Sequence, residues 1–277
     1  MDHQSPEFSL DTPESKNSQR KPLAERMRPI GLHEMIGQAH LLGEKCLLPK
    51  LIRENRVGNL ILAGPPGTGK TTLAGVVAKE GGCKLLKVNA VTSNVAELRE
   101  TLKLARYHGA DQCYLFVDEI HRFNKAQQDA LLPDVENGNI RLIGATTHNP
   151  YFYVIAPLLS RSLSFQLEPL SKDDIAELID RAIIDERAFP DRKVELAPAA
   201  REFLADICEG DARKVLTALE VAVMTTEENE SGVIEIDLST AEESIQKRAI
   251  IYGDDGHYDT ASAFIKSMRG SDPDAAV

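Results

Sequence analysis

The stretch Gly64-Pro65-Pro66-Gly67-Thr68-Gly69-Lys70-Thr71 decides the fold of this chain. It fits the pattern G-x-x-x-x-G-K-[ST], in which a glycine-rich loop cradles phosphate groups. The apolar run at 60–63 predicts a short buried strand before the loop, and helical spacing predicts a helix after it that ends at Gly81-Gly82. The loop therefore lies between a strand and a helix, as phosphate binding requires.

The residue types in this loop suit a nucleoside triphosphate. Glycines allow backbone N–H groups to approach phosphate oxygens, and the helix N-terminus adds partial positive charge. Lys70 is expected to reach the β- and γ-phosphates, and the Thr71 hydroxyl is expected to ligate Mg²⁺. We therefore predict ATP and Mg²⁺ as ligands, with every residue from Gly64 to Thr71 in contact with the nucleotide.

Composition limits the class of protein. The 277 residues suffice for one large domain or two ordinary ones, and 42% apolar with 27% charged residues is typical of a globular protein. No apolar run approaches the roughly 20 residues of a membrane span, and no secretion signal is recognisable, so we expect a cytoplasmic protein. The net charge of −11 argues against a broad nucleic-acid surface but is compatible with a local basic strip.

Strands and helices alternate through the first two thirds of the chain. This alternation predicts a doubly wound parallel sheet of five strands with helices on both faces. The predicted strands are 60–63, 85–88, 114–117, 142–145 and 163–167. Helices are predicted at 41–55, after Asn94 with Glu97 as its capping partner, and after Asn124 with Gln127 as its partner. Pro133 is expected to bend this last helix or to lie at its end.

The chain divides into four predicted parts. Residues 1–20 are predicted to be a disordered tail, and 21–168 a nucleotide-binding α/β domain. Residues 169–250 are predicted to form a small helical domain, and 251–277 the start of a further region. Within the helical domain we expect a helix that Ser171 opens together with Asp174, helices at 199–209, 212–225 and 239–247, and a short strand at 233–236.

Two carboxylates follow the third strand directly. Asp118 is expected to hold Mg²⁺, and Glu119 to orient and deprotonate an attacking water. The alternative is a solvated acidic pair at the end of a strand. Because ligands of parallel sheets bind at the carboxyl ends of the strands, the phosphate-binding loop favours the catalytic interpretation.

Other polar residues are candidates for the same site. Thr146-Thr147 ends the fourth strand, and one hydroxyl, preferably that of Thr147, is expected to sense the γ-phosphate; a capping role is the alternative. Arg161, which we place beyond the nucleotide edge of the sheet, could be an arginine finger for a neighbouring subunit or form a surface salt bridge. Arg213, at the start of a helix, could reach the phosphates or be an exposed helical arginine.

Three further features carry weaker signals. Asn89 follows the second strand and could hold Glu119 in an inactive pose, although a turn-forming asparagine is the commoner explanation. The run His121-Arg122-Phe123-Asn124-Lys125 could meet a phosphate backbone or a partner subunit, or be a solvated helix entry. No histidine or cysteine spacing predicts a transition-metal site or a disulfide framework.

Together these residues resemble the AAA+ ATPases, and within them the family of replication-associated recombination protein A and the Werner-helicase-interacting proteins. The specific stretches are Asp118-Glu119-Ile120-His121-Arg122-Phe123-Asn124-Lys125 and Arg269-Gly270-Ser271-Asp272, supported by 22–29, Ile36-Gly37-Gln38 and 142–149. The resemblance extends from about Pro22 to the end. His148 and the aromatic run Tyr151-Phe152-Tyr153 depart from the family pattern.

The resemblance implies more than the motifs alone. It implies DNA-stimulated ATP hydrolysis at stalled forks, DNA ends and strand junctions, with single-strand-binding protein, the replisome and a homotetramer as partners. It identifies Arg161 as the arginine finger and Arg213 as the sensor of the helical domain, and it places Ile36 and Gly37 near the adenine. The family continues beyond the point where this chain stops, so we expect a truncated copy in which the tetramer is weakened.

We therefore predict a Mg²⁺-dependent, DNA-dependent ATPase that acts in replication-fork maintenance, repair and recombination. A clamp-loader or Holliday-junction motor subunit with the same ATPase residues is the second hypothesis. The third is an ATP-binding scaffold with negligible turnover.

Overall fold

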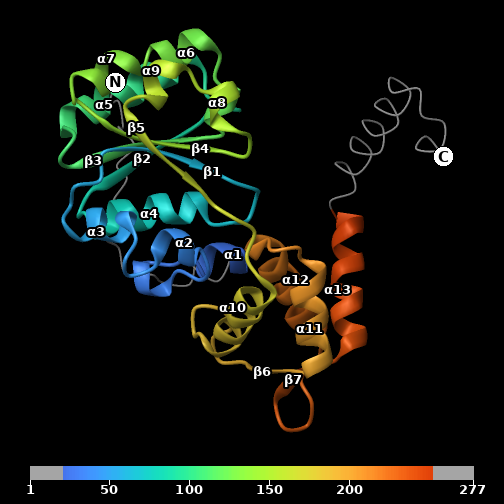
Figure 1. Cartoon of the computed structure of the whole chain (residues 1–277). Helices are drawn as coiled ribbons and strands as arrows, with labels where there is room; N and C mark the ends of the chain where they lie inside the picture. Colours follow the sequence, from blue (N-terminus) through green and yellow to red (C-terminus); the bar gives the residue numbers. More distant parts are fainter. Residues whose placement is uncertain (1–20, 252–277) are drawn as a thin grey trace, which may run out of the picture.

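The computed structural model describes residues 21–251 (Figure 1). The predicted tail at 1–20 and the Arg-Gly-Ser-Asp run lie outside the described residues. A five-stranded parallel sheet occupies the larger unit, in the order β2-β3-β4-β1-β5. The strands are β1 (Asn59–Ala63), β2 (Lys84–Asn89), β3 (Cys113–Asp118), β4 (Arg141–Thr146) and β5 (Ser162–Gln166). The predicted α/β fold with a parallel sheet is confirmed.

Helices cover both faces of this sheet because its strands are apolar on both sides. In β1, Leu60 and Leu62 pack with α3 (Leu47–Arg53) and α4 (Lys70–Glu80) on one face. Ile61 packs with α5 (Val95–His108), α7 (Leu132–Glu136) and α9 (Ala156–Leu159) on the other. The connections between the strands also contain the 3₁₀ turn η3 (Ile120–Arg122) and the short helices α6 (Lys125–Asp129) and α8 (Pro150–Tyr153).

Two of the predicted helices are divided in the structure. The prediction of one helix at 41–55 is wrong: α2 (Ala39–Leu42) ends at Gly43, and α3 begins only at Leu47. Pro49 explains the gap, because proline lacks an N–H and is tolerated only in the first turn of a helix. The helix after Asn124 is divided into α6 and α7, with Pro133 in the first turn of α7.

The starts of three helices were predicted correctly from pairs of capping residues. Three predicted caps are present as reciprocal side-chain and backbone hydrogen bonds, which define the starts of α5, α6 and α10 (Lys172–Ile184). They pair Asn94 with Glu97, Asn124 with Gln127, and Ser171 with Asp174.

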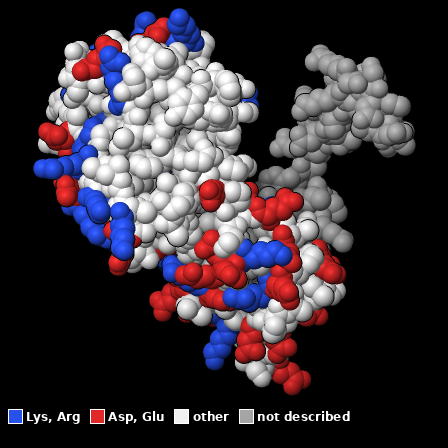
Figure 2. Space-filling model, viewed as in Figure 1, with Lys and Arg blue, Asp and Glu red and all other residues white. Residues whose placement is uncertain are grey.

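A smaller unit contains α10 (Lys172–Ile184), α11 (Pro198–Ile207), α12 (Ala212–Thr225) and α13 (Leu238–Ile251). The predicted strand β7 (Val233–Ile236) pairs in parallel with β6 (Lys193–Leu196), which we did not predict. The two units differ in charge: residues 21–168 contain 18 Lys and Arg against 14 Asp and Glu, and residues 169–250 contain 10 against 20. Figure 2 accordingly shows acidic residues crowded over the helical unit.

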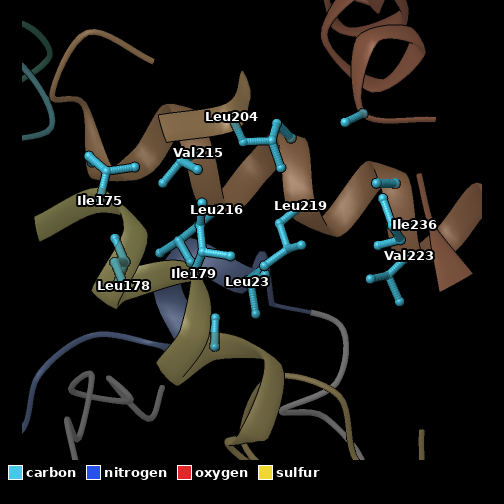
Figure 3. Packing of buried hydrophobic residues seen from close by; sticks show 14 of the residues in the cluster. Leu23, Ile175, Leu178, Ile179, Leu204, Val215, Leu216, Leu219, Val223 and Ile236 are labelled. Carbon is cyan, nitrogen blue, oxygen red and sulfur yellow. The ribbon is translucent and has the colours of Figure 1, made fainter. Parts of the chain in front are cut away.

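The N-terminal helix α1 (Leu23–Arg26) packs into the core of this helical unit. Leu23 is fully buried beside Leu216 and Leu219 of α12 (Figure 3). Glu220 of α12 accepts hydrogen bonds from the Leu23 backbone N–H at 2.9 Å and from the Arg26 guanidinium at 2.8 Å. The segment that precedes the α/β unit in sequence therefore stabilises the unit that follows it.

Replacing Leu23 by alanine is expected to destabilise the helical unit, because loss of a buried leucine side chain costs about 2–5 kcal/mol of unfolding free energy. Equilibrium unfolding in urea measures the change. The control is Val91→Ala, at a residue that is 63% exposed, for which we expect a change within about 0.5 kcal/mol. A Leu23→Ala protein as stable as the parent would contradict the packing of α1 against α12.

Candidate functional site

The glycine-rich loop between β1 and α4 forms a tight cradle at the carboxyl edge of the sheet. Gly67 has a φ of +71°, and a Cβ on it would collide with the carboxylate of Asp211, so only glycine fits at this point. Lys70 is 7% exposed and its Nζ donates to the backbone oxygens of Gly64 and Pro65, each at 2.7 Å. Burial lowers the pKa of Lys70, while Glu119 and Asp118 oppose that shift.

The two carboxylates after β3 have different environments. Asp118 ends the strand, and burial, followed by the adjacent Glu119 carboxylate, raises its pKa above the usual value. Glu119 turns out of the strand in the left-handed region, with a φ of +53°. Such a conformation costs a non-glycine residue about 1–2 kcal/mol and is most often retained at functional sites.

The two threonines at the end of β4 have different environments. Thr146 is fully buried, and its hydroxyl accepts a hydrogen bond from the His148 N–H at 3.0 Å. Thr147 faces the cavity, and its hydroxyl donates to Oε2 of Glu119 at 3.3 Å. The geometry therefore favours Thr147, the residue preferred from the sequence, as the one placed to act beside Glu119.

The helical unit forms the opposite wall. Asp211 caps α12 by accepting hydrogen bonds from the N–H groups of Arg213 and Lys214, and the Ala212 N–H donates to the Gly67 oxygen at 3.2 Å. The N-terminus of α12 is thus joined directly to the phosphate-binding loop. Arg213 lines the cavity, where its positive charge acts on both Lys70 and Asp118.

The segment before β1 forms a third wall. Ile36 lines the cavity, but Gly37 does not; its positive φ instead lets the backbone pass close to Leu170, at the junction of the two units. Gln38 is buried and links three segments, since its side-chain amide donates to the oxygens of Thr68 and Glu168 and accepts from the Glu168 N–H. The sequence contained no signal for this role of Gln38.

These walls enclose a cavity of about 900 Å³, a size typical of small-molecule sites. Its residues suit ATP with Mg²⁺: backbone N–H groups and a buried lysine for phosphates, and the oxygens of Thr71 and Asp118 for a hard cation. The loop residues Pro66 to Thr71 line it, whereas Gly64 and Pro65 line a smaller neighbouring cavity of about 440 Å³ together with His148 and Tyr151.

Arg161 lies at the other end of the sheet. Our sequence-based placement beyond the nucleotide edge is wrong, because Arg161 directly precedes β5 and its backbone oxygen accepts from Asn59, the first residue of the parallel strand β1. Its guanidinium pairs with Glu136 at 2.9 Å. Arg161 is therefore remote from the cavity of its own chain, and the surface salt bridge considered from the sequence is present.

The remaining candidates have mainly local roles. Asn89 accepts a hydrogen bond from the Val91 N–H at 2.9 Å, as expected for a turn-forming asparagine. Phe123 is 3% exposed and cannot stack on a base, whereas Arg122 and Lys125 are exposed. Asp211 is a site residue that we missed, although an aspartate directly before a helix is a recognisable cap.

Within residues 21–251, no helix is long and apolar enough to span a bilayer.

Comparisons with known proteins agree with this geometry. The model of the AAA family, "ATPase family associated with various cellular activities", matches residues 60–168, and that of the AAA C-terminal domain matches 190–269. The fold is similar to RuvB of Thermotoga maritima, described as a Holliday junction branch migration motor, with a TM-score of 0.61 and 27% identity over 80% of this chain and 72% of that one.

Curated relatives are more similar in sequence. Replication-associated recombination protein A is 43% identical in Bacillus subtilis, over 93% of this chain and 61% of the relative. In Escherichia coli K12 it is 42% identical, over 93% of this chain and 59% of the relative. ATPase WRNIP1 of Dictyostelium discoideum is 38% identical over 92% of this chain and 31% of the relative. The chain thus spans about 60% of the length of the bacterial relatives.

The fold, the phosphate-binding loop and the two matching domain models define this chain as an AAA ATPase. Its sequence relatives are more specific. The chain belongs to the family of replication-associated recombination protein A and WRNIP1.

Proposed function

We propose that this chain binds and hydrolyses ATP, and that hydrolysis drives an action on DNA during replication, repair and recombination. The observation that carries the proposal is the convergence of Lys70, Asp118, Glu119, Thr147 and Arg213 on one cavity, from two units that meet at the glycine-rich loop. These groups supply the parts of a phosphoryl-transfer site: a phosphate cradle, a cation ligand, a base and an arginine from the helical unit.

Each residue has a chemical task in this proposal. Thr71 and Asp118 would hold Mg²⁺, which would supply positive charge to neutralise the phosphates. Lys70 pairs with the same phosphates, and Glu119 accepts the proton of the water that attacks the γ-phosphorus. The bond between that phosphorus and the β–γ bridging oxygen breaks, so the products are ADP and phosphate. Arg213 and the Arg161 of a neighbouring subunit stabilise the charge of the transition state.

The direct contact between α12 and the loop suggests how hydrolysis produces motion. Asp211, Ala212 and Arg213 lie at one helix end that touches the loop and also points into the cavity. A change in the phosphates would alter those contacts and move the helical unit relative to the sheet. Because α1 packs on α12 as well, it would move with the helical unit.

DNA is proposed as the object of this motion. The names of the relatives refer to replication and recombination. The α/β unit carries a net positive charge, and Figure 2 shows a run of basic residues along its left side, whereas the helical unit is strongly acidic. A phosphate backbone would be attracted to the former and repelled by the latter. Forks, ends and strand junctions, single-strand-binding protein and a homo-oligomer belong to the same proposal.

Phosphate release from ATP tests the proposed function. With Mg²⁺ we expect turnover that increases severalfold when forked DNA is added and that disappears in Lys70→Ala, because removal of the ammonium leaves the phosphates without their main cationic partner. Absence of turnover under both conditions, with ATP still bound, would instead support the scaffold hypothesis. Turnover that is the same in Lys70→Ala would refute this site.

The similarity to the branch migration motor supports one competing function, a Holliday-junction motor subunit. The higher sequence identity to replication-associated recombination protein A favours the first proposal. The two differ in the DNA that should stimulate ATP turnover most. Stronger stimulation by a four-way junction than by a fork or a single-stranded end would favour the motor.

A further inference from the structure

The ring of His121 is buried beside Glu119. Its side chain is 4% exposed, and Nδ1 lies 3.2 Å from Oε2 of Glu119 and 3.0 Å from the hydroxyl of Thr146. The His148 ring packs edge-on against it, with centroids 4.4 Å apart. The imidazole is therefore held between the end of β4 and the carboxylate that we propose as the base.

The contact favours one tautomer of the His121 ring. A carboxylate can only accept hydrogen bonds, so the approach of Nδ1 to Oε2 is favourable when Nδ1 is protonated. The Thr146 hydroxyl is compatible with this arrangement, because it can accept from the imidazole and donate to the His148 backbone oxygen, at 3.3 Å. Burial lowers the pKa of His121, so the ring is a neutral imidazole that donates from Nδ1.

The position of the Glu119 carboxylate depends on the side chains around it. Glu119 is in the left-handed region, and its side chain is 30% exposed at the edge of the cavity. Two groups lie next to its Oε2: the Thr147 hydroxyl donates to it at 3.3 Å, and the His121 Nδ1 lies 3.2 Å away, within reach of a hydrogen bond. Thr147 also faces the cavity, but His121 is enclosed in the protein and has no other evident task in the reaction.

We propose that His121 is a positioning residue for Glu119. Its Nδ1–H and the Thr147 hydroxyl hold Oε2, which leaves Oε1 directed to accept the proton of the attacking water. This proposal rests on the proposed function, in which Glu119 is the base. It assigns His121 no contact with the nucleotide, so it predicts an effect on kcat rather than on KM.

Two substitutions of His121 distinguish the effect of its hydrogen bond from the effect of its aromatic ring. His121→Phe keeps an aromatic side chain but removes the donor, and His121→Asn places an amide N–H near the position of Nδ1. We expect His121→Phe to lower kcat for ATP about 10- to 100-fold with KM within about twofold, since small displacements of a reacting group cost rates of this order. We expect His121→Asn to recover most of that loss.

His148→Phe is the matched control. It changes the neighbouring ring without removing a donor to Glu119, so we expect kcat within about twofold of the parent. In a Glu119→Gln background, His121→Phe should cause no further loss, because two residues that act as a unit are not additive. Binding of a fluorescent ATP analogue shows whether each variant has kept its folded site.

The outcomes are distinguishable from failure of the proposed function. Full turnover in Glu119→Gln would refute Glu119 as the base, and with it the role of His121. If Glu119→Gln is inactive but His121→Phe keeps the kcat of the parent, only the role of His121 is refuted. A His121→Asn protein as impaired as His121→Phe, with ATP binding intact, would also refute the hydrogen bond as the cause.

Discussion

Glu119→Gln is expected to lower ATP turnover about 10²- to 10⁴-fold while ATP binding is retained, the range that general bases typically contribute. The amide cannot take a proton from water, yet it has nearly the same shape, and Lys70 and the loop remain unchanged. Phosphate release measures the loss, and titration with a fluorescent ATP analogue measures binding.

The control for this prediction is Glu100→Gln, a surface glutamate on α5 with a side chain that is 78% exposed. It removes the same charge far from the cavity, so we expect turnover within about twofold of the parent. Equal turnover in Glu119→Gln and the parent would exclude Glu119 as the base. Loss of ATP binding in Glu119→Gln would show instead that this side chain supports the nucleotide pocket.

Arg161→Ala is expected to lower turnover about 10³- to 10⁵-fold, the range that arginine fingers contribute. The structure places Arg161 at the amino edge of the sheet, away from the cavity of its own chain, so the loss would have to arise in a neighbour's site. The Glu136→Gln variant is the matched control: it breaks the same surface ion pair but keeps the guanidinium. We expect Glu136→Gln to be active.

Mixing two inactive variants tests the action between subunits. Arg161→Ala supplies an intact cavity, and Glu119→Gln supplies an intact finger. An assembly of both therefore contains some complete sites, and we expect turnover to reappear on mixing. Equal turnover of Arg161→Ala and the parent would refute the finger. Equal losses in Arg161→Ala and Glu136→Gln would mean that only the ion pair matters, although such exposed pairs contribute only about 0–1 kcal/mol to stability.

The predictions that succeeded rest on short-range signals. The strand and helix on either side of the glycine-rich loop, the strand that ends at Asp118 and the three capping boxes each depend on residues within one turn or one strand. Parallel strands then bring those strand ends to one edge, where register pairs Ala63 with Thr146 and Asn89 with Asp118. The meeting of the candidate residues at one edge was therefore predictable once the strands were recognised.

The predictions that failed concern where helices and strands begin and end, or where a side chain lies in the folded protein. Apolar spacing suggested one helix at 41–55, but Gly43 and Pro49 interrupt it. The strand β6 was missed because it is only four residues long and is defined by its pairing with β7. Arg161 was assigned to the wrong edge, because a residue just before a strand lies at that strand's amino end.

The sequence by itself determined the class of this protein. The strand, glycine-rich loop and helix, and the later strand that ends in two acidic residues, are each encoded by consecutive residues. Only the tertiary structure decided that α1 belongs with α12, nearly 200 residues later, through Leu23 and Glu220. It also decided that Thr147 rather than Thr146 faces the cavity, and that His121 touches Glu119. The first of these depends on how distant segments pack, and the last on the left-handed turn at Glu119; no pattern of residue types encodes either.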